Sequence, residues 1–266
     1  MSARDDLLAA ADALYAEGAS SRDAEVAGLK QRITELEAEL EPPAAVTEGF
    51  ADLSDWSTFD GANKYTSQGA RLEANTTLDD GVMTVWCRPV TKSVTVGGHT
   101  LTAGDYAAGM AQHRIARGPG TRYTMQLRMD ASVGTRAVAL LWPYQIGWPE
   151  GGELDFVENG ADLADRQSTA IANHWADAEG DNTQRVVKFP HDFTAWSDVE
   201  VLWKPGLFVV TVDGDEAARF TEHVPDNQMR LSIQTAVAGG GQAPTFKGAP
   251  RTPGCIQVRR LRIYDA

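Results

Sequence analysis

The stretch Leu140-Leu-Trp-Pro-Tyr-Gln-Ile-Gly-Trp-Pro-Glu-Gly-Gly-Glu-Leu-Asp-Phe-Val-Glu-Asn-Gly160 decides how this sequence folds. Its second half alternates acidic and apolar residues, a period of two that predicts a β-strand from Glu153 to Glu158. Its first half, from Trp142 to Gly152, is rich in glycine and aromatic residues, which predicts a loop at the rim of a binding face. We therefore expect a fold built around one strand with acids on one face and apolar side chains on the other.

The three acids of this strand share a face only if the strand is bulged. In an unbroken strand Glu153 and Asp155 lie on one face, and Glu158, five positions beyond Glu153, points the opposite way. One extra residue, which we place at Phe156-Val157, returns Glu158 to the acidic face. The apolar residues between the acids then face the core. The sequence thus predicts three carboxyl groups in a row along one strand.

The aromatic residues of the preceding loop bear on the meaning of these acids. Acids with this spacing also occur, merely solvated, on the exposed sheets of acidic proteins. A solvated strand, however, has no need of Trp142, Tyr144 and Trp148 in the loop that leads into it. Pyranose rings stack on aromatic faces while their hydroxyl groups seek carboxylates and amides. The combination therefore favours a sugar-binding site.

The spacing of the acids suggests a reaction. With one bulge, Glu153 and Glu158 have Cα atoms about 13 Å apart along the strand. If both side chains lean toward a sugar, their carboxyl groups can approach the roughly 5–5.5 Å that retaining glycosidases require. One glutamate would attack the anomeric carbon and the other would protonate the leaving oxygen, with Asp155 between them assisting. Spacing alone leaves open which glutamate has which role.

The rest of the chain after residue 48 also has a strand-like period of two. Ten segments, separated by Gly- and Asp-rich turns, predict strands at 81–90, 122–129, 136–142, 153–158, 169–175, 185–189, 198–204, 207–213, 229–236 and 256–264. No segment in this region has a convincing helical period. Many short strands without helices predict an antiparallel β-sandwich or jelly roll.

The N-terminal segment has a different character. Residues 1–43 hold ten acids and four bases, and apolar residues recur at intervals of three and four from Val26 to Leu40. This heptad pattern predicts a coiled coil, through which residues 26–40 would form a homo-oligomer, with a trimer as one candidate state. The alternative is a single amphipathic helix packed on its own domain. We therefore divide the chain into a helical segment (1–41), a Pro-rich linker (42–48) and a β domain (49–266).

Composition excludes several other classes. The 37 acids and 24 bases give a net charge of −13, which argues against nucleic acid as a partner. No apolar run is long enough to insert into a membrane, and the N-terminus has no secretory signal pattern. Cys87 and Cys255 lie in strand-like segments without ligand spacing, so we expect two buried free thiols rather than a disulfide or a zinc site.

The stretch from Trp148-Pro149 to Glu153-Leu-Asp-Phe-Val-Glu158 resembles the active-site strand of glycoside hydrolase family 16, in particular its laminarinase-like branch. Further stretches similar to that family follow in order, and the similarity extends over about residues 50–266; they are 169–175, 192–203, 210–214 and 227–234. One departure is Thr194, which stands where the family usually has a histidine. The resemblance implies a concanavalin-like jelly roll and a retaining endo-glycosidase that cuts β-linked polysaccharide.

The resemblance also implies roles for individual residues. Glu153 would be the nucleophile, Asp155 its assistant and Glu158 the acid/base. The residues expected to contact substrate are His174 and Gln234 along the cleft and, as sugar platforms, Trp142, Trp148 and Trp175. The alternatives are a polar strand-end residue for His174 and core packing for Trp175. No cofactor is expected, although many family members bind a structural calcium, for which Asp265 is the candidate ligand.

Two alternatives concern function and location. A sandwich of this kind also occurs in lectins, so a non-catalytic carbohydrate-binding protein for attachment is the second hypothesis. A coiled coil joined to a glycanase-like domain suggests a phage tail protein of the virion, bound to other tail proteins and acting on the host envelope; a secreted bacterial enzyme is the alternative. The acids of the site favour a neutral or weakly charged glycan.

Overall fold

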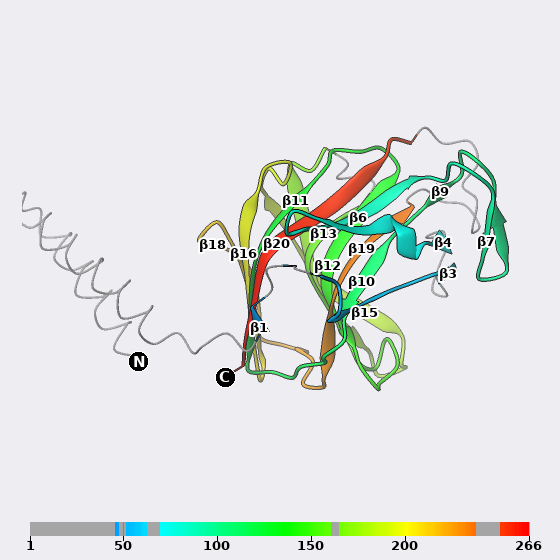
Figure 1. Cartoon of the computed structure of the whole chain (residues 1–266). Helices are drawn as coiled ribbons and strands as arrows, with labels where there is room; N and C mark the ends of the chain where they lie inside the picture. Colours follow the sequence, from blue (N-terminus) through cyan, green and yellow to red (C-terminus); the bar gives the residue numbers. More distant parts are fainter. Residues whose placement is uncertain are drawn as a thin grey trace, which may run out of the picture. The chain divides into compact units, whose positions relative to one another are not determined.

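A computed structural model describes residues 46–47, 50, 52–62, 70–160, 165–237 and 251–265 (Figure 1). The predicted helical segment 1–41 lies outside these residues. In the part of the chain that the structure describes, the one helix is a short 3-10 turn, η1 (Glu73–Asn75). No helix there is both long and apolar enough to cross a membrane.

The described residues form an antiparallel β-sandwich, as the sequence predicts. Its strands are β1 (Val46–Thr47), β2 (Trp56–Thr58), β3 (Gly61–Ala62), β4 (Ala70–Arg71), β5 (Thr76–Asp79), β6 (Val82–Pro89), β7 (Val94–Val96), β8 (His99–Leu101), β9 (Tyr106–Ala107), β10 (Met110–His113), β11 (Thr121–Met129), β12 (Thr135–Pro143), β13 (Glu153–Asn159), β14 (Ser168–Ala176), β15 (Asn182–Pro190), β16 (Ser197–Lys204), β17 (Leu207–Val212), β18 (Asp215–Phe220), β19 (Met229–Val237) and β20 (Gly254–Asp265).

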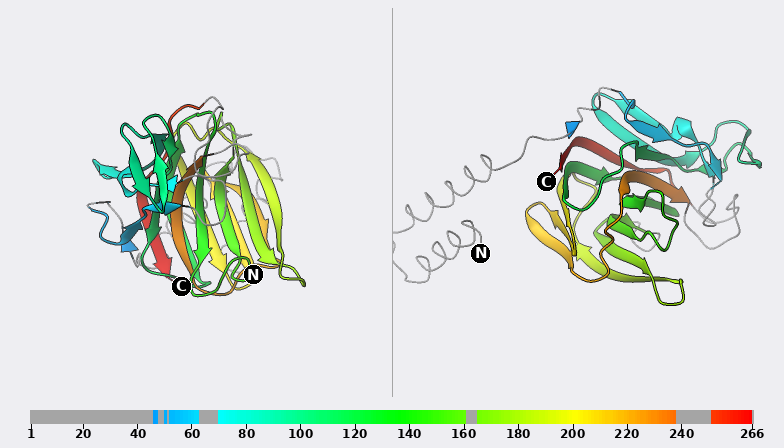
Figure 2. Two further views of the ribbon diagram at one scale, coloured as in Figure 1. Left: turned by 90° about the vertical axis from the view of Figure 1, so that its right-hand side faces the viewer. Right: turned by 90° about the horizontal axis from the view of Figure 1, so that it is seen from below.

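Two large sheets make up the sandwich. One runs in the order β18-β17-β16-β11-β20-β6-β5, with β1 beside β20 and β9 beside β6. The other runs β15-β14-β13-β12-β19-β10-β2, and the left view of Figure 2 looks onto its strands. The pairs β3-β4 and β7-β8 form two small separate sheets. Because β13 has neighbours on both sides, the predicted active-site strand lies inside a sheet.

Alternation along the strands creates the core between the sheets. On β11, residues Tyr123, Met125, Leu127 and Met129 are buried while the residues between them are partly exposed. They pack with alternate residues of the facing sheet, among them Leu231 and Ile233 of β19. The apolar face of each strand thus joins one core, as a two-layer sandwich requires.

All ten predicted strands are present, and the sequence missed others. All four residues of β10 are buried, so this strand has no polar–apolar alternation by which to identify it. Strand β1 uses two residues that the sequence analysis assigned to the linker; Val46 pairs with Ile263. The sheet therefore begins inside the segment predicted as linker.

The two cysteines are buried and free, as expected. Cys87 pairs with Gly254 across β6 and β20, and Cys255 pairs with Trp86. The two thiols therefore point to opposite faces of the sheet, which prevents a disulfide. Burial raises the pKa of each thiol to about 12, so both stay protonated.

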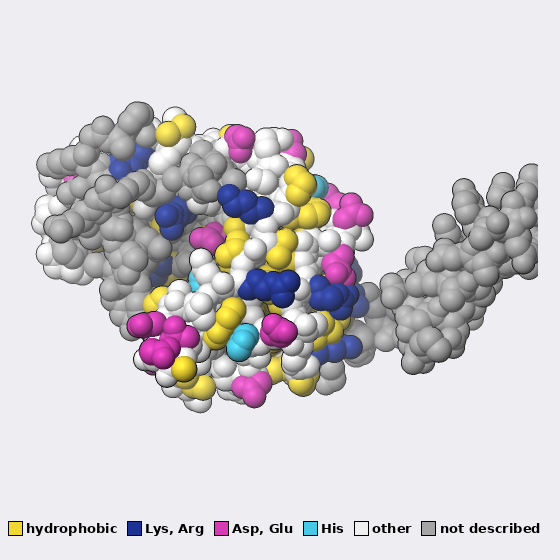
Figure 3. All heavy atoms as spheres, turned by 180° about the vertical axis from the view of Figure 1, so that it is seen from behind, with side chains coloured by type: hydrophobic (Ala, Val, Ile, Leu, Met, Phe, Trp, Pro, Cys, Tyr) yellow, Lys and Arg dark blue, Asp and Glu magenta, His cyan; other side chains and the backbone are white. Residues whose placement is uncertain are grey.

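The charge is not gathered into one patch on the side of the protein seen from behind. Figure 3 shows basic, acidic and hydrophobic side chains intermixed there. The net charge of −13 is thus not displayed as a continuous acidic surface on this side.

Candidate active site

The predicted bulge lies on β13. Asp155 pairs with Leu140 of β12 and Val157 pairs with Ala139, so Phe156 has no partner of its own on that strand. The register on the β14 side shifts over the same residues, between Asp155 and Glu158. Phe156 and Val157 are both fully buried in the core. The two consecutive core residues return Glu158 to the face that carries the other acids.

The neighbouring strands confirm that this face points away from the core. Val138 lies beside Glu158, and it alternates with Ala137 and Ala139, which belong to the core. We call the side of the seven-stranded sheet that carries Glu153, Asp155 and Glu158 the acidic face. Residues that pair across neighbouring strands point to the same face of the sheet, so the strand pairing identifies the other residues of the acidic face.

Asp155 lies at the centre of a polar cluster. It is only 2% exposed, and its Oδ2 lies 3.1 Å from Nε2 of His174, which pairs with Glu153 across β13 and β14. His174 Nδ1 lies 3.2 Å from Oδ1 of Asn182. Since that amide oxygen can only accept, we assign a hydrogen to Nδ1, and Nε2 faces Asp155.

Burial and repulsion change the acidity of two carboxyl groups. Burial, followed by the nearby charge of Asp155, raises the pKa of Glu153 well above its ordinary value, and His174 opposes this. Burial, followed by the charge of Glu158, raises the pKa of Asp155. The two carboxyl groups are neighbours, with an oxygen of each within 4.8 Å of an oxygen of the other. They therefore keep a proton at pH values where ordinary carboxyl groups have lost theirs.

Glu158 is positioned by its backbone. Its N–H donates to Oγ1 of Thr169 at 2.9 Å, and the Thr169 hydroxyl donates back to the Glu158 carbonyl at 3.2 Å. Across β12, Val138 pairs with both Glu158 and Gln234. Gln234 therefore lies on the acidic face, in the row of Glu158, where the sequence analysis expected a cleft residue.

Two of the three expected sugar platforms lie together at the Glu153 end of the acidic face. Leu141 pairs with Leu154, so Trp142, the next residue of β12, lies beside Glu153. The ring of Trp148 stacks on Trp142 with centroids 6.4 Å apart and planes 12° from parallel. The structure thus brings both tryptophans to the acids.

The third expected platform, Trp175, is not on this face. It follows His174 directly on β14, and neighbouring residues of a strand point to opposite faces. Its ring instead stacks on His223, with centroids 4.4 Å apart. The prediction that Trp175 lines the substrate site is therefore corrected: adjacent residues of one strand cannot both contact a sugar on the acidic face.

The glycines before Glu153 allow the loop to close tightly. Gly152 has φ of +68°, and a Cβ there would lie 2.4 Å from Cγ of Pro225 and 3.0 Å from the His174 carbonyl oxygen. Pro225 is itself held, because its carbonyl accepts a 3.0 Å hydrogen bond from Trp203 Nε1. Only glycine fits this position without strain, so the turn fixes where Glu153 begins its strand.

Sequence reasoning missed several residues of the acidic face. Gln112 donates to Ser232 Oγ at 2.9 Å in the row of Asp155, and Arg71 donates to Oε1 of Gln234 at 2.6 Å. Asn182 holds the His174 ring, as described above. These residues come from distant strands and carry no local motif, so no signal in the sequence identified them.

The residues around Asp265 do not fit the calcium site that the resemblance implied. Asp265 Oδ1 lies 3.2 Å from Nε of Arg117, whose side chain is only 9% exposed. Calcium needs six to eight oxygen ligands, and a guanidinium on the same carboxylate would repel it. Elsewhere in the described residues, the only cluster of three metal-ligating side chains is Glu153, Asp155 and His174. We assign that cluster to proton sharing.

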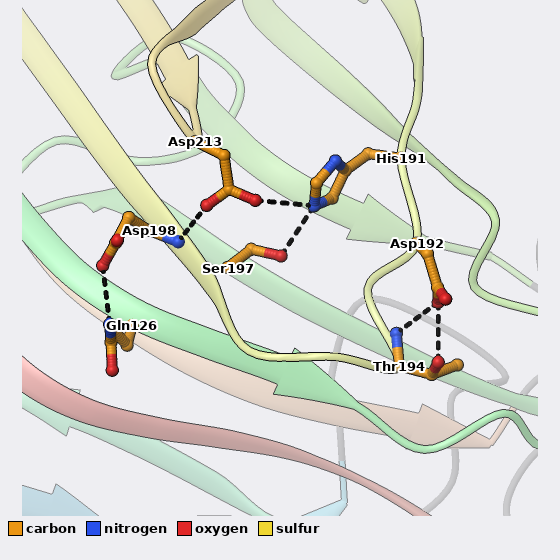
Figure 4. Close-up of polar contacts among 7 residues, drawn as sticks. All are labelled: Gln126, His191, Asp192, Thr194, Ser197, Asp198 and Asp213. Atoms are coloured by element: carbon orange, nitrogen blue, oxygen red, sulfur yellow. Dashed lines mark hydrogen bonds and ion pairs between the residues drawn. The ribbon is translucent and has the colours of Figure 1, made fainter.

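A second polar cluster resembles a nucleophilic triad but lacks its geometry. His191 Nε2 lies 2.7 Å from Ser197 Oγ and 3.3 Å from Asp213 Oδ2, so both partners use the same nitrogen (Figure 4). A triad needs the acid on the other nitrogen, Nδ1. This cluster therefore joins the segment before β16 to the β17–β18 turn. Thr194 lies nearby and donates to Asp192 Oδ1 at 2.6 Å in an exposed turn.

Comparisons with known proteins give the fold. No protein-family model matches the sequence, and no curated protein does either. The structure is similar to the laminarinase catalytic domain from Thermotoga maritima, with 14% identity, a TM-score of 0.69, and coverage of 85% of this chain and 99% of that one.

Two further solved structures are similar. For the endo-β-1,3-glucanase from Pyrococcus furiosus the identity is 16% and the TM-score 0.68, with coverage of 84% of this chain and 94% of that one. For a lichenase, a β-1,3-1,4-glucanase derived from a mouse hindgut metagenome, the values are 14% and 0.62, with coverage of 83% and 97%. The β domain thus has the sandwich fold of these glucanases.

Proposed function

We propose that the β domain is a glycoside hydrolase of family 16 that cuts β-linked polysaccharide internally with retention of configuration. The observation that carries the proposal is the bulge of β13, which places Glu153, Asp155 and Glu158 on one face beside Trp142. Two glutamates on either side of a buried aspartate match the two-carboxylate requirement of glycoside hydrolysis. The shared fold with glucanases agrees with it.

In the proposed reaction Glu153 is the nucleophile. Its carboxylate attacks the anomeric carbon while Glu158 gives its proton to the leaving oxygen, so a glycosyl ester replaces the glycosidic bond. Glu158 then takes a proton from water, and the water oxygen displaces Glu153. The two displacements together retain the configuration.

Asp155 and His174 are positioned to accept the proton that Glu153 must lose before it attacks the anomeric carbon. The pKa of Glu153 is raised by burial and by the charge of Asp155, so an ionised nucleophile needs a neighbour to hold the proton. Asp155 has a carboxyl oxygen within 4.8 Å of a Glu153 oxygen, and its Oδ2 lies 3.1 Å from His174 Nε2. Moving the proton onto Asp155, with His174 as the next acceptor, leaves Glu153 ionised.

The roles of the two glutamates are tested by pairing variants with leaving groups. Glu158→Gln should lower kcat on polysaccharide by about 10²- to 10⁴-fold. With an aryl glycoside whose activated leaving group needs no proton, release of the first equivalent of the leaving group should stay fast, and later turnovers should be slow because hydrolysis of the glycosyl ester lacks its general base. Glu153→Gln should abolish both reactions. Full activity of Glu153→Gln would overturn the assignment, and tight oligosaccharide binding by the wild-type protein without any turnover would favour a lectin.

For the N-terminal segment we propose, from the heptad pattern of residues 26–40 alone, that it forms a homo-oligomer and displays several β domains. The proposed location is the virion, as a phage tail protein acting on the host envelope, with secretion from a bacterium as the alternative. Linked copies would raise avidity without new contacts. Such display suits an enzyme that also serves attachment to a polysaccharide surface.

A further inference from the structure

Arg71 brings a guanidinium group onto the acidic face from another sheet. It ends β4, and its Nη2 donates the 2.6 Å hydrogen bond to Gln234 Oε1. Gln234 lies opposite Val138, which in turn lies opposite Glu158. Gln234 is therefore two strand spacings, about 10 Å, from the proposed acid/base. A polysaccharide that crosses the sheet at Glu158 would pass Arg71 with a neighbouring sugar residue.

No negative charge compensates the Arg71 guanidinium among the described residues. Burial alone lowers its pKa to about 10, without an opposing contribution from any acid. Its hydrogen-bond partner on the acidic face is a neutral amide. A desolvated cation without a counter-charge is costly, so this arrangement is typical of a site that receives an anion.

A second guanidinium lies on the same face beyond Glu158. Arg136 is two residues before Val138 on β12, about 7 Å along the strand. Its Nε is buried and has no hydrogen-bond partner among the described residues. Arg230, at the opposite end of the face, also has a buried Nε without a hydrogen-bond partner among the described residues, and its guanidinium lies 4.1 Å from the ring centre of Tyr144. Two guanidinium groups, those of Arg71 and Arg136, therefore lie on the Glu158 side.

A guanidinium fork matches the two oxygens of a carboxylate or a sulfate better than the hydroxyl groups of a neutral sugar. We propose that Arg71, positioned by Gln234, is the specificity-determining residue of the site and binds an acidic group on the sugar next to the one cleaved. The inference rests on the proposed glycosidase function. It replaces the expectation of a neutral glycan: Glu158 is two strand spacings, about 10 Å, from Gln234, which is about one Debye length and weakens the repulsion of an anion bound beside Gln234.

A matched pair of substrates tests the proposal. The first is a soluble β-1,3-glucan, and the second is the same glucan with part of its primary alcohols oxidised to carboxylates; a sulfated form separates carboxylate from sulfate. For the wild-type protein we expect KM to be about 10- to 100-fold lower for an acidic form, a difference that Arg71→Gln removes while kcat is kept. Binding of the same glucans to Glu153→Gln, measured by calorimetry, should show the same preference without turnover.

Two controls make the result specific. Arg71→Lys keeps the charge but not the fork and should recover only part of the preference. Arg219→Gln removes an arginine that pairs with Glu216 on exposed β18, and it should leave the ratio of the two KM values unchanged. Circular dichroism of each variant reports whether it is folded.

The outcomes separate the two proposals. Equal KM values for neutral and acidic glucans in the wild-type protein, or an equal loss on both in Arg71→Gln, would overturn the role of Arg71 while leaving the glycosidase in place. The wild-type comparison needs no variant, so it decides the question even if Arg71→Gln fails to fold. Absence of both binding and cleavage with all three glucans would count against both proposals.

Discussion

At the scale of single residues, the buried acids of the site lower the stability of the folded protein. Asp155 is almost completely buried, although it lies between two other acids and can be neutral only by holding a proton. Its contacts with Glu153 and His174 distribute that proton rather than remove the charge. Packing alone would favour apolar residues in place of such a group of acids, which supports the catalytic role proposed for them.

The raised pKa of Glu153 predicts the pH dependence of stability. Between its ordinary value of 4.5 and its raised folded value, the folded state binds more protons than the unfolded state. The free energy of unfolding therefore falls as pH rises through this window, by about 1.4 kcal/mol for each unit between the two pKa values. Glu153→Gln removes this loss, so the variant should gain stability relative to wild type as pH rises from 5 to 8.

Urea unfolding of both proteins at each pH measures this effect. Glu216→Gln is the control, because the hydrogen bond from Arg219 lowers the pKa of the exposed Glu216 below its ordinary value of 4.5, so its effect on stability should not change between pH 5 and pH 8. A stability difference between Glu153→Gln and wild type that is the same at pH 5 and pH 8 would contradict the explanation.

At the scale of elements, the turn and the bulge together determine where β13 places its acids. The turn at Gly152 sets the first residue of the strand, and the bulge at Phe156 sets the face of the last acid. Both depend on neighbours: Pro225 packs over the turn, and the β14 residue Ile171 packs with the bulge residues in the core. The strand therefore needs its surroundings to hold the acids in a row.

The close packing at Gly152 predicts the effect of a single methyl group. Gly152→Ala adds a Cβ at φ of +68° against Pro225, so we expect a loss of about 1–3 kcal/mol in the free energy of unfolding and a lower kcat. Gly147→Ala is the matched control in the same loop, since its nearest atom is the flexible Glu150 Oε2 at 3.7 Å. Chemical denaturation and reducing-end release measure the two effects; equal behaviour of the two variants would show that the contact with Pro225 is unimportant.

At the scale of the whole molecule, the chain joins a glucanase-like sandwich to a segment of unlike composition. The sandwich accounts for the proposed chemistry by itself, because every described site residue comes from it. An oligomer formed by the heptads of residues 26–40 would increase the number of linked β domains without changing the catalytic site. Loss of the oligomer should therefore weaken binding to a polymer with repeated sites. It should leave activity on a short oligosaccharide unchanged.

Disrupting the heptads tests this separation in the full chain. The double variant Ile33→Asp, Leu36→Asp places charges on the predicted seam and should sediment as a monomer, whereas the wild-type chain should sediment as an oligomer. Cleavage of a short oligosaccharide should be unchanged per β domain, and apparent affinity for an immobilised polysaccharide should fall by about 10²- to 10⁴-fold. A wild-type chain that is monomeric at high concentration would remove the oligomer proposal.

The sequence by itself determined the β-sandwich, the bulge and the three acids, because alternation of side chains along a strand follows from backbone geometry and can be read locally. That same alternation could have shown that His174 and Trp175 face opposite ways. Only the tertiary structure decided that Arg71 meets Gln234 across 163 positions of sequence, and that Asp265 already has a cation in Arg117. Those contacts depend on the order of strands in the sheets and on packing between layers, which no local pattern specifies.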